Sequence, residues 1–167
     1  MPAAGPHSGG ITSQMNNFFR NFSLIFAAGA FGGFVKAIVA WSFGATSLNT
    51  ALGFMMAPAL TSMWIYQHVV WGGIWAFLFF LPLRWSYYTR GALYSLAQTL
   101  IQPVIIFPKM GKGMLGLELG YMAPVLVTFF GVIWGLATAF WLKFSREGSE
   151  NPGGVPDKDF PPPRQRR

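Results

Sequence analysis

The chain contains no cysteine and very few acidic residues. With no cysteine among its 167 residues, disulfides and thiolate metal sites are excluded. Of the five Asp and Glu residues, only Glu118 comes before residue 147. Paired carboxylates, a Ser-His-Asp triad or a metalloprotease motif therefore cannot be assembled from the body of the chain. We expect a protein that is not an enzyme, with no catalytic residue and no metal site.

Charged residues of either sign are scarce. They make up 10% of the chain, against about 25% in an ordinary soluble domain, while hydrophobic residues reach 53%. Three long stretches carry no Asp, Glu, Lys or Arg, namely those between Lys36 and Arg84, between Arg90 and Lys109, and between Glu118 and Lys143. Because a helix of about 20 apolar residues crosses the bilayer core, these stretches predict membrane spans.

The predicted fold class is all-α, a polytopic membrane bundle of four transmembrane helices. The spans are expected near residues 22–43, 63–83, 91–107 and 121–142. Apolar runs such as 71–83 do not alternate with polar residues, which disfavours a transmembrane barrel. Residues 18–144 thus form the transmembrane domain. The Gly-, Pro- and Ser-rich residues 1–17 and the Pro- and Arg-rich residues 145–167 are expected to be flexible tails.

The positive residues predict the orientation of the helices. Cations flanking the N-terminus, the second connection and the C-terminus are Arg20, Arg84, Arg90, Lys143 and Arg146, against Lys109 and Lys112 in the third connection. Positive loops stay in the cytoplasm, so both termini are expected inside, with the first helix retained rather than cleaved. The net charge of +7 serves this anchoring, and no nucleic acid partner is expected. The uncharged connection 44–62 is either an interfacial loop or a re-entrant segment.

Small residues four apart predict where the helices pack closely. Gly29 and Gly33 share one face of the first span, and Gly131 and Gly135 share one face of the last. Such pairs let two helix backbones approach within a membrane. They predict packing inside the bundle, with self-association as the alternative.

Lys36 is the most notable polar residue within a span. It lies about seven residues, or roughly 10 Å, from the outer end of the first span, so its side chain reaches only part of the way to the interface. One interpretation is structural, with Lys36 paired to Glu118 or to carbonyls of a broken helix. The other is a role in handling an ion, a proton or a ligand.

Three further polar residues are candidates for function. Gln98 and Gln102 lie four apart on the third span, and they either line a polar path or bond to a neighbouring helix. His68 lies one turn into the second span, and it is either an interfacial polar residue or the single axial ligand of a pigment or haem. No cofactor is otherwise predicted, since neither cysteine nor a nearby second histidine is available.

One connection resembles a known family. The stretch 107–125, which runs Phe-Pro-Lys-Met-Gly-Lys-Gly-Met-Leu-Gly-Leu-Glu-Leu-Gly-Tyr-Met-Ala-Pro-Val, resembles DUF6789, a small four-helix bacterial membrane family of unknown function. His68 and the segment 71–76 are similar to that family's second helix. A fainter similarity to YagU-type inner-membrane proteins lies at 34–36 and 97–98. The resemblance implies four helices in a bacterial inner membrane, and it implies no activity.

These observations leave three hypotheses for the function. The first is a non-catalytic accessory or structural subunit that associates with other membrane proteins or with itself in the lipid bilayer. The second is a small transporter or channel whose path involves Lys36, Gln98 and Gln102. The third is a subunit that binds a pigment or haem through His68.

Overall fold

The computed structural model describes residues 9–81, 83–109, 111 and 113–150, and no strand occurs among them. The elements in chain order are α1 (Gly9–Ala45), α2 (Leu48–Ala51), α3 (Ser62–Trp75), η1 (Ala76–Phe80), α4 (Tyr87–Ile101), η2 (Gln102–Ile106), α5 (Phe107–Lys109), η3 (Met114–Leu119) and α6 (Ala123–Glu150). Four helical stretches are long and apolar enough to cross a membrane, as predicted. They are Ser13–Ala45, Ser62–Phe80, Tyr87–Lys109 and Ala123–Arg146.

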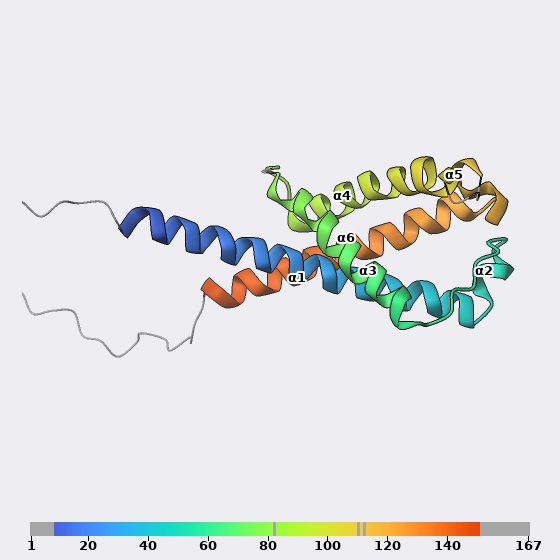
Figure 1. Cartoon of the computed structure of the whole chain (residues 1–167), viewed down its shortest axis with the longest axis horizontal. Helices are drawn as coiled ribbons and strands as arrows, with labels where there is room; N and C mark the ends of the chain where they lie inside the picture. Colours follow the sequence, from blue (N-terminus) through green and yellow to red (C-terminus); the bar gives the residue numbers. More distant parts are fainter. Residues whose placement is uncertain (1–8, 82, 110, 112, 151–167) are drawn as a thin grey trace, which may run out of the picture.

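The long helices form two antiparallel pairs that cross. Helix α3 packs along α1, α4 packs along α6, and the α1–α6 crossing joins the two pairs. The first residues of α1 and the last residues of α6 lie at the same end of the molecule, and α2 lies at the opposite end with α5 (Figure 1). Helices α3 and α4 scarcely touch each other, so the bundle is open between them near α2.

Local signals explain where the shorter helices begin and break. Thr61 precedes α3 and its hydroxyl accepts a hydrogen bond from the Trp64 amide at 3.1 Å. Ser86 does the same for Thr89 ahead of α4, at 3.3 Å. These are N-caps, which satisfy amides that have no partner within the helix. Pro103 lacks an amide hydrogen, and it lies in the π-helical segment η2, where the α-helical ladder of α4 is interrupted.

The outer helices are longer than the predicted spans. Helix α1 begins at Gly9 and α6 ends at Glu150, so both enter ranges that the composition assigned to tails. No proline occurs between Gly9 and Ala45, so no residue without an amide hydrogen interrupts α1. Polar helix ends of this kind carry no apolar signal by which sequence reasoning would include them. Residues 1–8 and 151–167, the rest of those tails, lie outside the described residues.

Glycines bring α1 and α3 into backbone contact. The positions where side chains of Gly29 and Gly33 would start are occupied by backbone atoms of Gly72 and His68 and by the Ala76 side chain. Any larger residue at these positions would push the helices apart. The two glycines therefore pack within the bundle, which is the arrangement that small residues four apart predict.

Glycines also bring α4 and α6 into close contact. Gly135 faces the Gly91 backbone and the Ser95 side chain, while Gly131 faces the Thr99 hydroxyl. Both glycines of α6 are thus turned toward α4. Gly91, on the facing helix, meets the Gly135 carbonyl and the Ala139 methyl group.

The crossing of α1 and α6 is held by Trp134. This side chain is fully buried, and its indole Nε1 donates a hydrogen bond to the Gly29 carbonyl at 3.2 Å. Gly32 lies against Trp134 and the buried Thr138. A large aromatic ring fits at the crossing because the facing residues of α1 carry no side chain.

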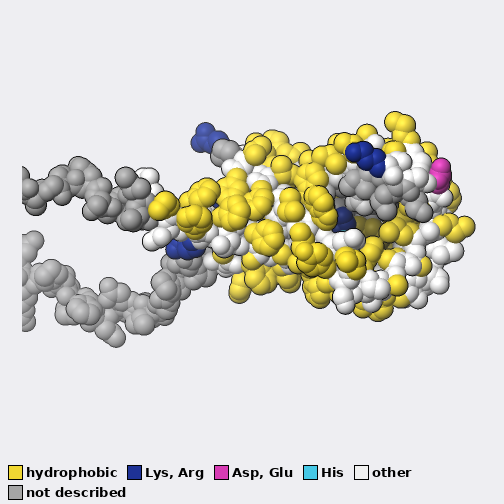
Figure 2. Space-filling view, in the orientation of Figure 1, with side chains coloured by type: hydrophobic (Ala, Val, Ile, Leu, Met, Phe, Trp, Pro, Cys, Tyr) yellow, Lys and Arg dark blue, Asp and Glu magenta, His cyan; other side chains and the backbone are white. Residues whose placement is uncertain are grey.

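The outer surface suits a lipid environment. Between its two ends, the visible face of the described residues is covered mainly by hydrophobic side chains (Figure 2). Leu100, Val125 and Phe140 are each more than half exposed. An apolar band of this kind around four long helices is typical of membrane proteins.

The backbone contact between α4 and α6 yields a stability prediction. We expect Gly91→Leu to destabilise the protein by about 1–3 kcal/mol, the usual range for overpacking a tight interface, although leucine favours helix more than glycine does. Ala97→Leu is the matched control, because Ala97 is exposed on the same helix. Thermal unfolding in mild detergent measures both variants, and an unchanged midpoint for Gly91→Leu would contradict the packing.

Candidate functional site

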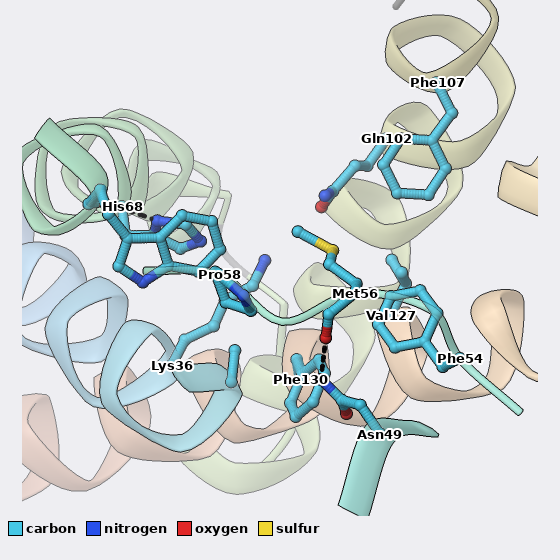
Figure 3. A pocket seen from close by; sticks show the side chains of 12 residues that line it. Lys36, Asn49, Phe54, Met56, Pro58, His68, Gln102, Phe107, Val127 and Phe130 are labelled. Carbon is cyan, nitrogen blue, oxygen red and sulfur yellow. Dashed lines mark hydrogen bonds between the residues drawn. The ribbon is translucent and has the colours of Figure 1, made fainter. Parts of the chain in front are cut away.

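A polar cavity lies at the open end of the bundle, where α1, α3, α6 and the 46–61 connection meet η2 and α5 (Figure 3). The cavity is partly open to the outside, and its volume is about 40 Å³, room for roughly three water molecules. The lining residues are Lys36, Ala40, Asn49, Phe54, Met56, Pro58, Trp64, His68, Gln102, Phe107, Val127 and Phe130. A few polar groups thus face one small space inside an otherwise apolar wall.

Lys36 carries the charge of this cavity. The residue is 8% exposed and lies on α1, nine positions before its last residue, or about 14 Å along the helix axis. Its side chain runs into the cavity, and its ammonium group ends in the space between His68 and Gln102 (Figure 3). Among the described residues no hydrogen bond or ion pair reaches this group.

The structure does not bring Glu118 to Lys36. Glu118 is exposed on η3, beside Gly113, and forms no ion pair with any described residue. No Asp or Glu lines the cavity. The structural interpretation in which Glu118 neutralises Lys36 is therefore wrong for this conformation, because η3 turns that carboxylate outward.

His68 faces the cavity from α3 with a defined hydrogen-bond pattern. Its Nδ1 lies 2.9 Å from the carbonyl oxygen of Trp64. A carbonyl oxygen only accepts, so Nδ1 carries the hydrogen and Nε2 of the neutral ring is an acceptor. The Trp64 ring packs against the imidazole with centroids 4.1 Å apart, and its Nε1 donates to the Ala37 carbonyl at 3.4 Å. These contacts fix the orientation of His68.

The connection between α1 and α3 closes the cavity from the end. Asn49 is 1% exposed, and its Nδ2 donates to the Met56 carbonyl at 2.6 Å. The Met55 amide donates to the Leu119 carbonyl at 2.6 Å. Residues 46–61 thus form a cap that packs on the bundle and on η3.

Glycine conformation makes the contact between cap and η3 possible. Gly53 has φ +74° and its Cα lies against the Tyr121 ring, while Gly120 has φ +123° and lies against the Gly53 carbonyl. Residues with a Cβ rarely adopt such angles. The two connections on this side of the bundle therefore meet at a glycine contact.

The structure separates Gln98 from Gln102. Gln102 lines the cavity, and no hydrogen bond to its side chain occurs among the described residues. Gln98 is buried, does not line the cavity, and its Oε1 has no partner in the described part of the chain. The two side chains are one α-helical turn apart, since the Gln102 amide donates to the Gln98 carbonyl, but only Gln102 faces the cavity.

Asn49 is the functional candidate that sequence reasoning missed. It lies in an uncharged connection, where an asparagine usually marks a turn. Its Oδ1 is buried and has no hydrogen-bond partner among the described residues. The only signal in the sequence was the absence of charge from a connection between two spans, which is compatible with burial.

The cavity is too small for a pigment or haem. Pockets for small organic molecules have volumes of about 300–1,000 Å³, whereas the volume of this one is about 40 Å³. No group of three or more His, Cys, Asp or Glu side chains lies close enough to hold a metal within the described chain. The geometry instead suits water or one small ion.

The opposite end of the bundle carries aromatic side chains paired with cations. The Arg90 guanidinium donates to the Phe79 and Leu81 carbonyls at 2.7 and 2.9 Å. Arg146 lies over the Tyr87 ring and Lys143 over the Tyr88 ring, at 5.8 and 5.7 Å. These contacts anchor the helix ends, and they form the type of belt seen where helices meet the membrane surface.

No family model, curated protein or solved structure matches the chain. The similarity to DUF6789 therefore stays a prediction from the 107–125 segment. Met110 and Lys112 of that segment lie outside the described residues.

Proposed function

We propose that the chain is a small non-catalytic membrane protein that binds a small ion in the Lys36 cavity and passes it across the bilayer. One observation carries this proposal: Lys36 is buried in a water-sized cavity, and no carboxylate accompanies it. Even lenient insertion scales assign about 2.5–3.5 kcal/mol to a lysine at the centre of a membrane helix. Because the buried charge of Lys36 has no partner within the chain, it favours the binding of an ion from outside the chain.

We infer that four spans lie in a bacterial inner membrane with both termini in the cytoplasm. The apolar lengths of the four helices support the spans, and the belt of Arg90, Lys143 and Arg146 supports a cytoplasmic location for that end. On this orientation the Lys36 cavity lies in the outer half of the membrane. The cap, residues 46–61, lies between the cavity and the outer solution.

The proposed orientation predicts a labelling pattern. The chain has no cysteine, so a single introduced cysteine is the only residue in the chain that a maleimide labels. Trp85→Cys, at an exposed site of the second connection, should react in intact cells only with a permeant maleimide. Leu117→Cys, exposed on η3, should also react with an impermeant one. The reverse pattern would overturn the orientation.

The proposed ion site predicts the effect of removing the charge. We expect Lys36→Met to reduce ion flux into proteoliposomes about tenfold or more, because a hydrogen bond to a charged group contributes about 1.5–3 kcal/mol. The flux is measured with a panel of small anions and cations under an applied potential. Lys109→Met is the control, since Lys109 is an exposed lysine at the same end. Equal flux through the Lys36→Met variant and the parent would contradict the proposal.

A second candidate function is that of an accessory subunit, and the N-terminal part of α1 favours it. Residues 13–22 of this helix are exposed throughout. Met15, Phe18 and Phe19 are each more than half exposed. Ser13–Ala45 spans about 50 Å at 1.5 Å per residue, well beyond the roughly 30 Å of the hydrocarbon core. The exposed Met15, Phe18 and Phe19 on this extra length offer a docking surface to other membrane chains or to a second copy.

Site-directed photocrosslinking tests this second candidate. A photoreactive residue at Phe19 should give a discrete protein adduct in native membranes, because this side chain faces away from the bundle. The same residue at Leu100, which is 65% exposed on α4, should give lipid adducts only. A lack of protein adducts at both sites, with a solitary chain after mild extraction, would rule out the accessory role.

A further inference from the structure

The hydrogen-bonding groups of the Lys36 cavity narrow the chemistry of the ion. Lys36 supplies the only formal charge in the lining. Of all Asp and Glu residues in the first 146 positions, only Glu118 exists, and it points outward. A monovalent anion would make the site neutral, whereas a cation would add a second positive charge to an apolar surrounding. The charge of the cavity therefore selects a monovalent anion.

One neutral side chain of the cavity adds a hydrogen-bond acceptor. The Nε2 of neutral His68 is an acceptor, since Nδ1 holds the hydrogen. The Asn49 amide does not contribute, since its Nδ2 donates to the Met56 carbonyl and its buried Oδ1 is turned away from Lys36 (Figure 3). An acceptor needs a donor, and a halide or nitrate ion has none. His68 therefore favours a ligand that also carries an O–H.

The size of the cavity limits the ligand further. About 40 Å³ holds roughly three waters, which is comparable to one small oxyanion. Phe54, Phe107 and Phe130 contribute apolar side chains to the lining, so the charged part of the ligand is confined to the space beside Lys36. The Lys36 ammonium and the Gln102 amide approach the same space from opposite sides (Figure 3).

We propose that the cavity binds a small monovalent oxyanion that carries an O–H donor, of the bicarbonate class. Lys36 supplies the counter-charge, and His68 Nε2 accepts the O–H. Gln102 supplies a further amide to an oxyanion oxygen. This inference rests on the proposed function and names its ligand class.

Bicarbonate and nitrate form a matched pair of probes. Both are planar monovalent oxyanions of similar size, and only bicarbonate has an O–H. Thermal unfolding of the whole chain in lipid nanodiscs is followed while sodium bicarbonate, nitrate or chloride is added at constant pH and ionic strength. A ligand that binds only the folded state raises the unfolding temperature as it saturates its site. We expect bicarbonate to raise the unfolding temperature at a concentration at least several-fold lower than nitrate or chloride.

Two variants connect this response to the cavity. Lys36→Met should abolish it, and Lys109→Met should leave it unchanged. Gln102→Glu places a carboxylate opposite Lys36 at a position where no described hydrogen bond is lost. This variant should unfold at a higher temperature than the parent in the absence of added anion, and it should no longer respond to bicarbonate. It keeps the test valid even if Lys36→Met does not fold.

The outcomes separate the ligand class from the proposed function. If bicarbonate and nitrate act at equal concentrations, or if Gln102→Glu responds as the parent does, the O–H-bearing anion is wrong. In that case loss of flux in Lys36→Met would still support an ion site of another kind. If Lys36→Met changes neither the flux nor the anion response, both the ligand class and the proposed function are overturned.

Discussion

A lysine buried in an apolar bundle without a carboxylate is the constraint on which the rest of this structure depends. An isolated ammonium is strongly disfavoured in a medium of low dielectric constant. The bundle responds by keeping a small polar space around Lys36, with Asn49, His68 and Gln102 at its wall. The cavity is thus the direct consequence of one charge in the first span, and the proposed ion-binding function follows from how that charge is compensated.

The glycine contacts determine where this space can exist. Gly29 and Gly33 hold α1 against α3, and Gly91 and Gly135 hold α4 against α6. Each pair is closely packed along its length, and Trp134 joins the pairs at their crossing. Because α3 and α4 are not held together in the same way, the bundle stays open between them at one end. The cap, residues 46–61, then covers that opening.

Much of the fold was predictable from the sequence, and the site was predictable only in part. Long uncharged stretches indicate four helices because charge is so unfavourable in a bilayer, and a lysine within such a stretch stands out for the same reason. Asn49 could not be identified in this way, since an asparagine in a loop belongs to no sequence pattern that reveals its burial. Of the partners considered for Lys36, Glu118 does not reach it, because η3 turns that carboxylate outward through positive φ angles at Leu115 and Gly116, which the sequence does not predict. Helical spacing placed Gln98 and Gln102 on one face, but it could not show that only Gln102 lines the cavity.

The most direct test of this account is a high-resolution experimental structure in lipid, determined in bicarbonate buffer. The account predicts a non-protein occupant at hydrogen-bond distance, about 2.7–3.2 Å, from both the Lys36 ammonium and the His68 Nε2. A Lys36 ammonium paired directly with a carboxylate of this chain, or a dry cavity closed by apolar side chains, would contradict it.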